Sequence, residues 1–202
     1  MRYKVFNEII FFLFTLVIDA QEAEDSEIRF SKYFPDMVNL QYAGNTGMVS
    51  AGPSWFVCKD KLKVDCSVGF VPKFEARHPI YIMSLKGIYI TEPSLRIKNV
   101  NVKPVNFGMA FSYTFGNRFN RYLNINKYPK GYYWWNTACR FGFLYQFQAY
   151  IRPEWEIIEK LGFYFEASFW DVDIYSRIDN GNDSYLSLWD ITTFGFGTSI
   201  FF

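Results

Sequence analysis

Apolar and small polar residues alternate along most of this chain, and this alternation restricts the possible folds more than any other feature. In the segment 194–202, Phe or Ile occupies most even positions, and Gly or Ser occupies most odd positions. The segments 62–70 and 105–115 repeat the pattern. Successive side chains of a β-strand point to opposite faces, so a period of two predicts strands with one apolar and one polar face.

Segments of this kind follow one another, separated by turn residues, and none has the pattern of a long helix. Several exceed the roughly 9–11 residues that a strand tilted by about 45° needs to cross a bilayer. The sequence therefore predicts an all-β domain over residues 37–202, an eight-stranded antiparallel up-and-down transmembrane β-barrel. The eight segments are 37–45, 47–58, 62–71, 80–91, 104–115, 136–151, 160–175 and 186–202.

The composition of the polar face distinguishes a membrane barrel from a soluble ligand-binding barrel, which is the alternative. A soluble barrel carries long charged side chains on its outer face, but here the polar face is mainly Gly, Ala, Ser, Asn, Thr and Gln. Such small residues fit the lumen of a narrow barrel, and aromatic residues, 22% of the chain, fit a lipid-facing exterior. Because 21 basic residues balance 20 acidic ones, no nucleic-acid partner is expected.

The amino-terminal residues predict export. Arg2 and Lys4 precede an uncharged apolar run at 9–18, which is too short to span a hydrocarbon core about 30 Å thick. We predict a signal peptide over residues 1–20, cleaved after Ala20 or Ala23, and then a periplasmic amino-terminal segment over 21–36.

The carboxy-terminal residue points to the same location. Phe202 ends an aromatic-rich strand and resembles the terminal signal of bacterial outer-membrane proteins, which the barrel-assembly machinery recognises. An ordinary apolar terminal strand is the alternative. Export would permit disulfides, but the three cysteines Cys58, Cys66 and Cys139 allow at most one and lack metal-site spacing. We interpret Cys66 and Cys139 as free thiols that behave as small apolar side chains.

An amino terminus in the periplasm directs the connections after the first, third, fifth and seventh strands outward. The longest, residues 116–135, contains a cluster of Tyr and Trp that is consistent with a membrane-interface girdle or with a surface that recognises sugar or protein. The outward-loop aromatics are Tyr128, Tyr132, Tyr133, Trp134 and Trp135. In the inward connection 152–159, residues 155–158 suggest a short helical turn.

Five charged residues fall on the polar faces of the predicted strands. A narrow lumen would force such charges to pair, so a network that plugs the barrel is expected, with a proton or ion path as the alternative. This lumen polar cluster comprises Lys63, Asp65, Lys86, Arg140 and Glu166.

Catalytic and metal sites have weak support. The single histidine, His78, could form an enzyme site with Ser84 and Glu166, as in membrane-embedded lipid hydrolases, but six residues along a strand separate His78 from Ser84 by about 20 Å. The His-x-Ser motif of lipid A deacylases is absent from the sequence. No cofactor is expected, and the acidic residues at 171, 173, 179 and 183 lack the spacing of a calcium loop.

Four short motifs, at residues 38–45, 69–73, 85–89 and 131–134, resemble a group of uncharacterised outer-membrane barrel proteins of Bacteroides-type bacteria. The likeness extends through most of residues 37–202 and implies a fold and a location but no activity. We therefore expect a non-catalytic outer-membrane barrel with a structural or interaction role through its outward loops. Its expected partners are outer-membrane lipid and the assembly machinery. A narrow transport or ion-conducting barrel and a deacylase-like lipid-modifying enzyme are the alternatives.

Overall fold

The structure is a computed structural model that describes residues 34–92, 94–116, 119, 138–155, 158–178 and 187–202. The signal-peptide prediction therefore lies outside the described residues. The described elements are β1 (Met37–Ala43), β2 (Val49–Val57), β3 (Leu62–Val71), β4 (Ile80–Ile90), β5 (Leu95–Ile97), β6 (Val100–Thr114), β7 (Cys139–Ile151), β8 (Lys160–Trp170), α2 (Asp171–Ile178) and β9 (Thr192–Phe201).

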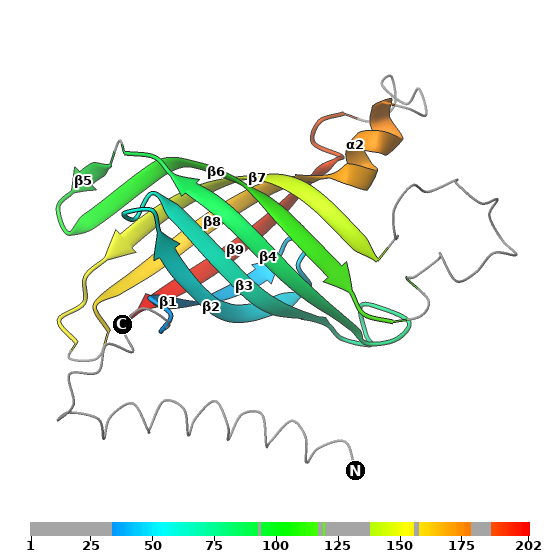
Figure 1. Cartoon of the computed structure of the whole chain (residues 1–202), viewed down its shortest axis with the longest axis horizontal. Coiled ribbons are helices and arrows are strands. Elements are labelled where there is room, and N and C mark those ends of the chain that lie inside the picture. The colour runs from blue at the N-terminus through cyan, green and yellow to red at the C-terminus, as the bar shows by residue number, and fades with distance from the viewer. Residues whose placement is uncertain (1–33, 93, 117–118, 120–137, 156–157, 179–186) are drawn as a thin grey trace, which may run out of the picture. The chain divides into compact units, whose positions relative to one another are not determined.

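Eight of the strands close into an antiparallel barrel, as the sequence predicted (Figure 1). Consecutive barrel strands pair with each other, and the first strand, β1, also pairs with the last, β9, over Met37–Ala43 and Gly195–Phe201. The short strand β5 lies outside the barrel and pairs with the beginning of β6. Barrel closure leaves none of the eight strands with an unpaired long edge, so their backbone groups are satisfied within the wall.

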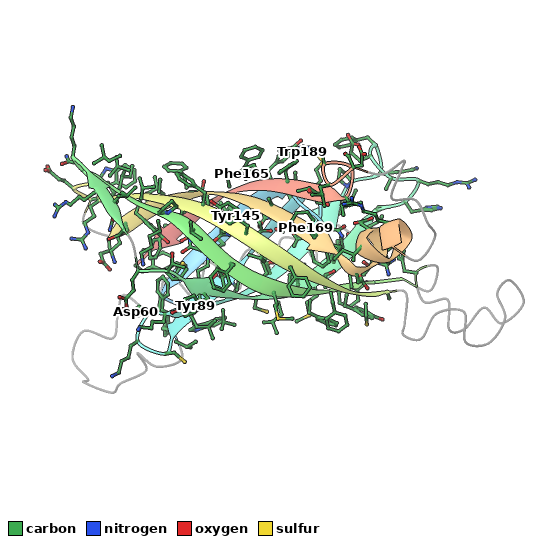
Figure 2. The ribbon with its side chains drawn as sticks, turned by 90° about the horizontal axis from the view of Figure 1, so that it is seen from above. Asp60, Tyr89, Tyr145, Phe165, Phe169 and Trp189 are labelled. Atoms are coloured by element: carbon green, nitrogen blue, oxygen red, sulfur yellow. The ribbon has the colours of Figure 1, made fainter. Side chains whose placement is uncertain are left out.

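The two faces of the wall differ in polarity as the alternation predicted. Apolar side chains stand on the outside, where Phe107 and Phe143 remain 53% and 58% exposed, whereas polar side chains point inward and are buried. Figure 2 shows side chains extending away from the ribbon, with Phe165 on one side of the barrel and Tyr89 on another. Many outer rings meet their direct cross-strand partners, as in Tyr89–Phe107 with ring centroids 5.4 Å apart, and such pairs help to fix the strand register.

The prediction that the segment 160–175 is a strand was wrong at its end, because β8 stops at Trp170 and the helix α2 begins at Asp171. Alternation continues through Val172 and Ile174, so hydrophobic pattern alone did not mark this boundary. The helix has acidic residues in its first turn and Arg177 in its last turn, an arrangement that the helix dipole favours. None of the helices in the described part of the chain is long and apolar enough to cross a bilayer.

The starts of two other strands, β6 and β9, differ from the predicted starts by four residues or more. The strand β6 begins at Val100, four positions before the predicted start at residue 104, because a register irregularity between Lys103 and Asn106 accommodates Pro104 within the strand. The strand β9 begins at Thr192 and not at residue 186, since Ser187 donates from its backbone N–H and its hydroxyl to the Asp190 carboxylate, both at 2.8 Å, in a turn. Of the short helical turn expected at 155–158, residues 156–157 lie outside the described residues, and Trp155 is not helical.

Candidate functional site

A buried ion pair crosses the lumen between strands that are not neighbours. Lys86 of β4 donates from Nζ to both carboxylate oxygens of Glu166 on β8, at 2.7 and 2.8 Å, and the two side chains are 3% and 2% exposed. The same ammonium donates to Oε1 of Gln41 on β1 at 2.8 Å. Gln41 also accepts a hydrogen bond from the Tyr164 hydroxyl at 3.2 Å. This ion pair therefore connects strands from different sides of the barrel.

A second buried ion pair lies on β3. Lys63 Nζ is 3.5 Å from Oδ2 of Asp65 and donates at 3.2 Å to Oε1 of Gln146 on β7. Gln146 in turn donates from Nε2 to Glu166 at 3.3 Å, so that it joins the two ion pairs. Two ammonium groups and two carboxylates thus balance each other, as burial of charge requires.

The network continues along the inner face of β7. Gln148 donates from Nε2 to Gln146, and the Tyr150 hydroxyl donates to Gln148. Gln146 and Gln148 are buried. Tyr150 and Phe201 both line a cavity at one end of the barrel. These glutamines and Gln41 were not among the predicted lumen residues. Gln146 and Gln148 share the polar parity of Arg140 on β7, and Gln41 shares that of Asn39 on β1, so the same criterion could have found them.

An apolar cluster fills the lumen beside this network. Ile88, Ile90, Ala110, Leu144 and Trp170 form it, and each is less than 5% exposed. The Trp170 indole N–H donates to the Ser168 hydroxyl at 3.0 Å, which satisfies the polar end of the ring. The lumen is therefore closed by packed side chains of both kinds, and not only by the small polar residues that the alternation predicted.

Of the five residues predicted to form the lumen cluster, four come together and Arg140 does not. Arg140 stands at the beginning of β7, where its guanidinium lies near Asp171 and Asp173 of α2. Burial raises the pKa of both carboxyls above their usual range, and the charge of Arg140 opposes that rise. Arg140 therefore interacts with the helix after β8 and not with the central network.

The residues of the enzyme hypothesis are not brought together. Ser84 is 1% exposed on the inner face of β4, and its hydroxyl lies 2.7 Å from that of Ser67. Glu166 is held by Lys86, whereas His78 is exposed in the connection between β3 and β4. A triad needs contact from nucleophile to base and from base to acid, and this arrangement does not provide it.

Several predicted residues cannot be placed. The aromatic cluster at residues 128–135 and the acidic residues 179 and 183 lie outside the described residues. Within the described ranges, no group of three or more His, Cys, Asp or Glu side chains could hold a metal ion. Cys58 is exposed, Cys66 and Cys139 are half-buried, and all three are free thiols.

The barrel end that contains the carboxy terminus has an open cavity of about 480 Å³. Aromatic rings of Phe56, Tyr150 and Phe201 contribute to its lining, with charged residues of both signs around them. Lys160 in this lining pairs with Glu159 at 2.8 Å, and that hydrogen bond lowers the pKa of the Glu159 carboxyl. Phe202 is 59% exposed here, and its backbone N–H donates to the carbonyl of Asp36 at 3.3 Å.

Comparison with known proteins identified no relative: no protein-family model, no curated protein and no solved structure gave a significant match.

Proposed function

We propose that this chain is a non-catalytic outer-membrane β-barrel whose role is structural or is exercised through its outward loops. The observation that carries the proposal is the inverted polarity of the barrel, with charged side chains buried in the lumen and large apolar side chains on the outer face. Examples on that face are Val68, Met109 and Phe143, which are 59%, 60% and 58% exposed. In water such a surface would aggregate, whereas in hydrocarbon it meets a matching solvent.

Tryptophans near both ends of the barrel support this location. Trp155, in the connection between β7 and β8, is 60% exposed, and Trp189, in the connection between β8 and β9, is 74% exposed. Figure 2 draws Trp189 at the edge of the barrel. Indole rings favour the level of the lipid headgroups, so tryptophans at the two ends are typical of a barrel that spans a bilayer. The expected partners are therefore outer-membrane lipid and the barrel-assembly machinery.

A closed lumen favours the structural role over an ion-conducting barrel. The Lys86–Glu166 pair spans the lumen at 2.7 Å, and the apolar cluster fills space beside it. An ion crossing this layer would have to separate two buried, paired charges, at a cost of several kcal/mol. We therefore expect the barrel to be non-conducting.

Lipid-modifying activity is the weaker candidate, because Ser84 faces the closed lumen and Glu166 is bound to Lys86. Refolded protein should leave lipid A and phospholipids unchanged, and His78→Ala should alter neither folding nor any binding that is found. Release of fatty acid by the parent protein that is lost in folded His78→Ala would support the enzyme instead. The resemblance to barrels of Bacteroides-type bacteria agrees with the proposed location and adds no activity.

Cell fractionation tests the proposal. The mature chain should sediment with the outer membrane and should migrate faster on a gel before heating than after heating, because the folded barrel resists detergent. Recovery of the chain as a soluble periplasmic protein would contradict the proposal. In a planar bilayer the reconstituted protein should give no conductance steps, and regular steps would favour the conducting barrel.

A further inference from the structure

Two oxygen atoms inside the lumen network have no hydrogen-bond donor among the described residues. They are Oδ1 of Asn39 on β1 and Oδ1 of Asp65 on β3, and both residues are 5% exposed. The other polar atoms of the same side chains are paired, since Asn39 donates from Nδ2 to Ser54 at 2.7 Å and Asp65 Oδ2 lies 3.5 Å from Lys63. A buried acceptor without a donor costs roughly 1–3 kcal/mol, so two in one network call for an explanation.

Both residues line the same small cavity, which measures about 10 Å³. This volume is near the lower limit of about 10–15 Å³ that accommodates one water molecule and excludes any larger ligand. The lining also contains the polar side chains of Gln41, Ser67, Lys86 and Tyr164. A water molecule in the cavity would therefore be surrounded by hydrogen-bond donors and acceptors. The cavity touches both ion pairs, because Asp65 of one pair and Lys86 of the other are among its lining residues.

We propose that this cavity is a binding site for a single water molecule, which donates one hydrogen bond to Asn39 Oδ1 and the other to Asp65 Oδ1. The water joins Asn39 of β1 to the Lys63–Asp65 pair of β3, so that two strands that do not pair with each other are connected through the lumen. A sodium ion would also suit oxygen ligands, but the two lysines already balance the two carboxylates, and a further cation would leave one buried positive charge uncompensated beside Lys86. The site depends only on the lumen and not on what surrounds the barrel.

A high-resolution crystal structure of the refolded full-length protein tests the site directly. We expect one peak of electron density at roughly 2.6–3.2 Å from both Asn39 Oδ1 and Asp65 Oδ1, the range of hydrogen bonds to water. Distances near 2.4 Å, or replacement of the peak by an anomalous signal after a rubidium soak, would assign a cation and overturn the proposal. A direct contact between the two oxygens without density between them would mean a protonated Asp65 and would also overturn it.

Variants separate the water from the rest of the network. Asn39→Leu removes one of the two acceptors and should abolish the peak, whereas Ser54→Ala removes only the partner of Asn39 Nδ2 and should leave the peak in place. If Asn39→Leu does not fold, the parent protein still decides through its melting temperature in sodium chloride and in choline chloride at equal ionic strength. Equal melting temperatures support water, and a higher value in sodium would overturn the proposal in favour of a cation.

Discussion

The outer face and the lumen of this barrel have opposite chemistry although they alternate residue by residue along the same strands. On β7, Phe143 points outward and is 58% exposed, while Gln146, three positions further, points inward and has no exposed surface. In a soluble protein burial normally selects apolar side chains, and charged ones are buried only when they are paired. Here the exposed surface is apolar and the centre is ionic, which is the pattern expected of the proposed membrane barrel, whose surroundings are less polar than its interior.

This comparison also separates two sources of stability. The outer rings contribute through their surroundings and through pairs such as Phe111–Phe141, with centroids 5.0 Å apart. The lumen contributes through geometry, because each buried charge must find a partner within about 4 Å or remain uncompensated. The stability change caused by an outer-face substitution should therefore depend on the solvent around the barrel. The change caused by a lumen substitution should depend on which hydrogen-bond or ion-pair partner is lost.

The largest effect is expected in the lumen. Glu166→Gln leaves the Lys86 ammonium buried without a carboxylate and should lower the free energy of unfolding by about 3–5 kcal/mol. Urea unfolding in lipid vesicles measures it. The matched control is Glu92→Gln, which removes an exposed carboxylate 3.2 Å from Lys61 and should cost less than about 1 kcal/mol. Equal losses in the two variants would mean that the central ion pair contributes no more than a surface pair.

An arginine on the outer face should have the next largest effect. Phe107→Arg places a charge near the middle of the apolar face and should cost about 2–4 kcal/mol if that face meets hydrocarbon. Phe107→Leu is the control, since it shortens the side chain without adding charge. The measurement is the same unfolding experiment in vesicles, and full tolerance of Phe107→Arg together with solubility in the absence of detergent would favour a soluble barrel.

Two neighbouring glycines sharpen the contrast between the faces. A Cβ at Gly108, on the inner parity of β6, would lie 2.2 Å from the backbone oxygen of Gly87, whereas a Cβ at Gly87, on the outer parity of β4, would meet nothing within 4 Å. Gly108→Ala should therefore destabilise the barrel by at least the roughly 1–3 kcal/mol typical of overpacking. Gly87→Ala should be nearly neutral. A heat-modifiability assay across a urea series compares them, and the reverse order would show that the two faces are assigned wrongly.

The smallest effect concerns α2, the helix that follows β8. Burial raises the folded-state pKa of Asp173, so the folded protein holds this proton more tightly than the unfolded chain does. Stability from this group is therefore present below the usual carboxyl pKa and is lost as the pH rises through the folded pKa. Asp173→Asn removes the titrating group and should flatten that decline, which begins near the usual carboxyl pKa of about 4. Thermal unfolding at a series of pH values provides the measurement, and an unchanged pH profile would contradict the assignment.

The sequence predicted the strands well wherever one face was apolar and the other small and polar. Residues 62–71, where the alternation is unbroken, match β3 at both ends. Prediction failed at the end of β8, because the period-two spacing of apolar residues continues past Trp170 into α2 and so does not mark where the strand ends. It also failed at Pro104, because a proline normally ends a strand but here sits at an irregularity within β6.

The lumen site was predictable in its members but not in its pairing. Parity along each strand places Lys63, Asp65, Lys86 and Glu166 on the inner face, so their burial could be expected. Which carboxylate meets which ammonium depends on strand tilt and on barrel closure, since Lys86 and Glu166 stand on β4 and β8, strands that do not pair with each other. Arg140 also lies on the polar face of its strand, but it stands too near the beginning of β7 to reach the centre of the lumen. Alternation does not encode this difference in position along the barrel axis.

The most direct test of the central claim, that the outer face meets lipid, is the accessibility of spin labels in vesicles. Single cysteines at Met109 and Phe143, in a background in which the three natural cysteines are replaced, would carry the nitroxide, with Lys59 in the turn between β2 and β3 as the aqueous control. At both outer positions we expect collisions with oxygen, which dissolves in hydrocarbon, to exceed those with a water-soluble nickel chelate, and the opposite order at residue 59. Greater access of the nickel chelate at Met109 and Phe143 would contradict the account.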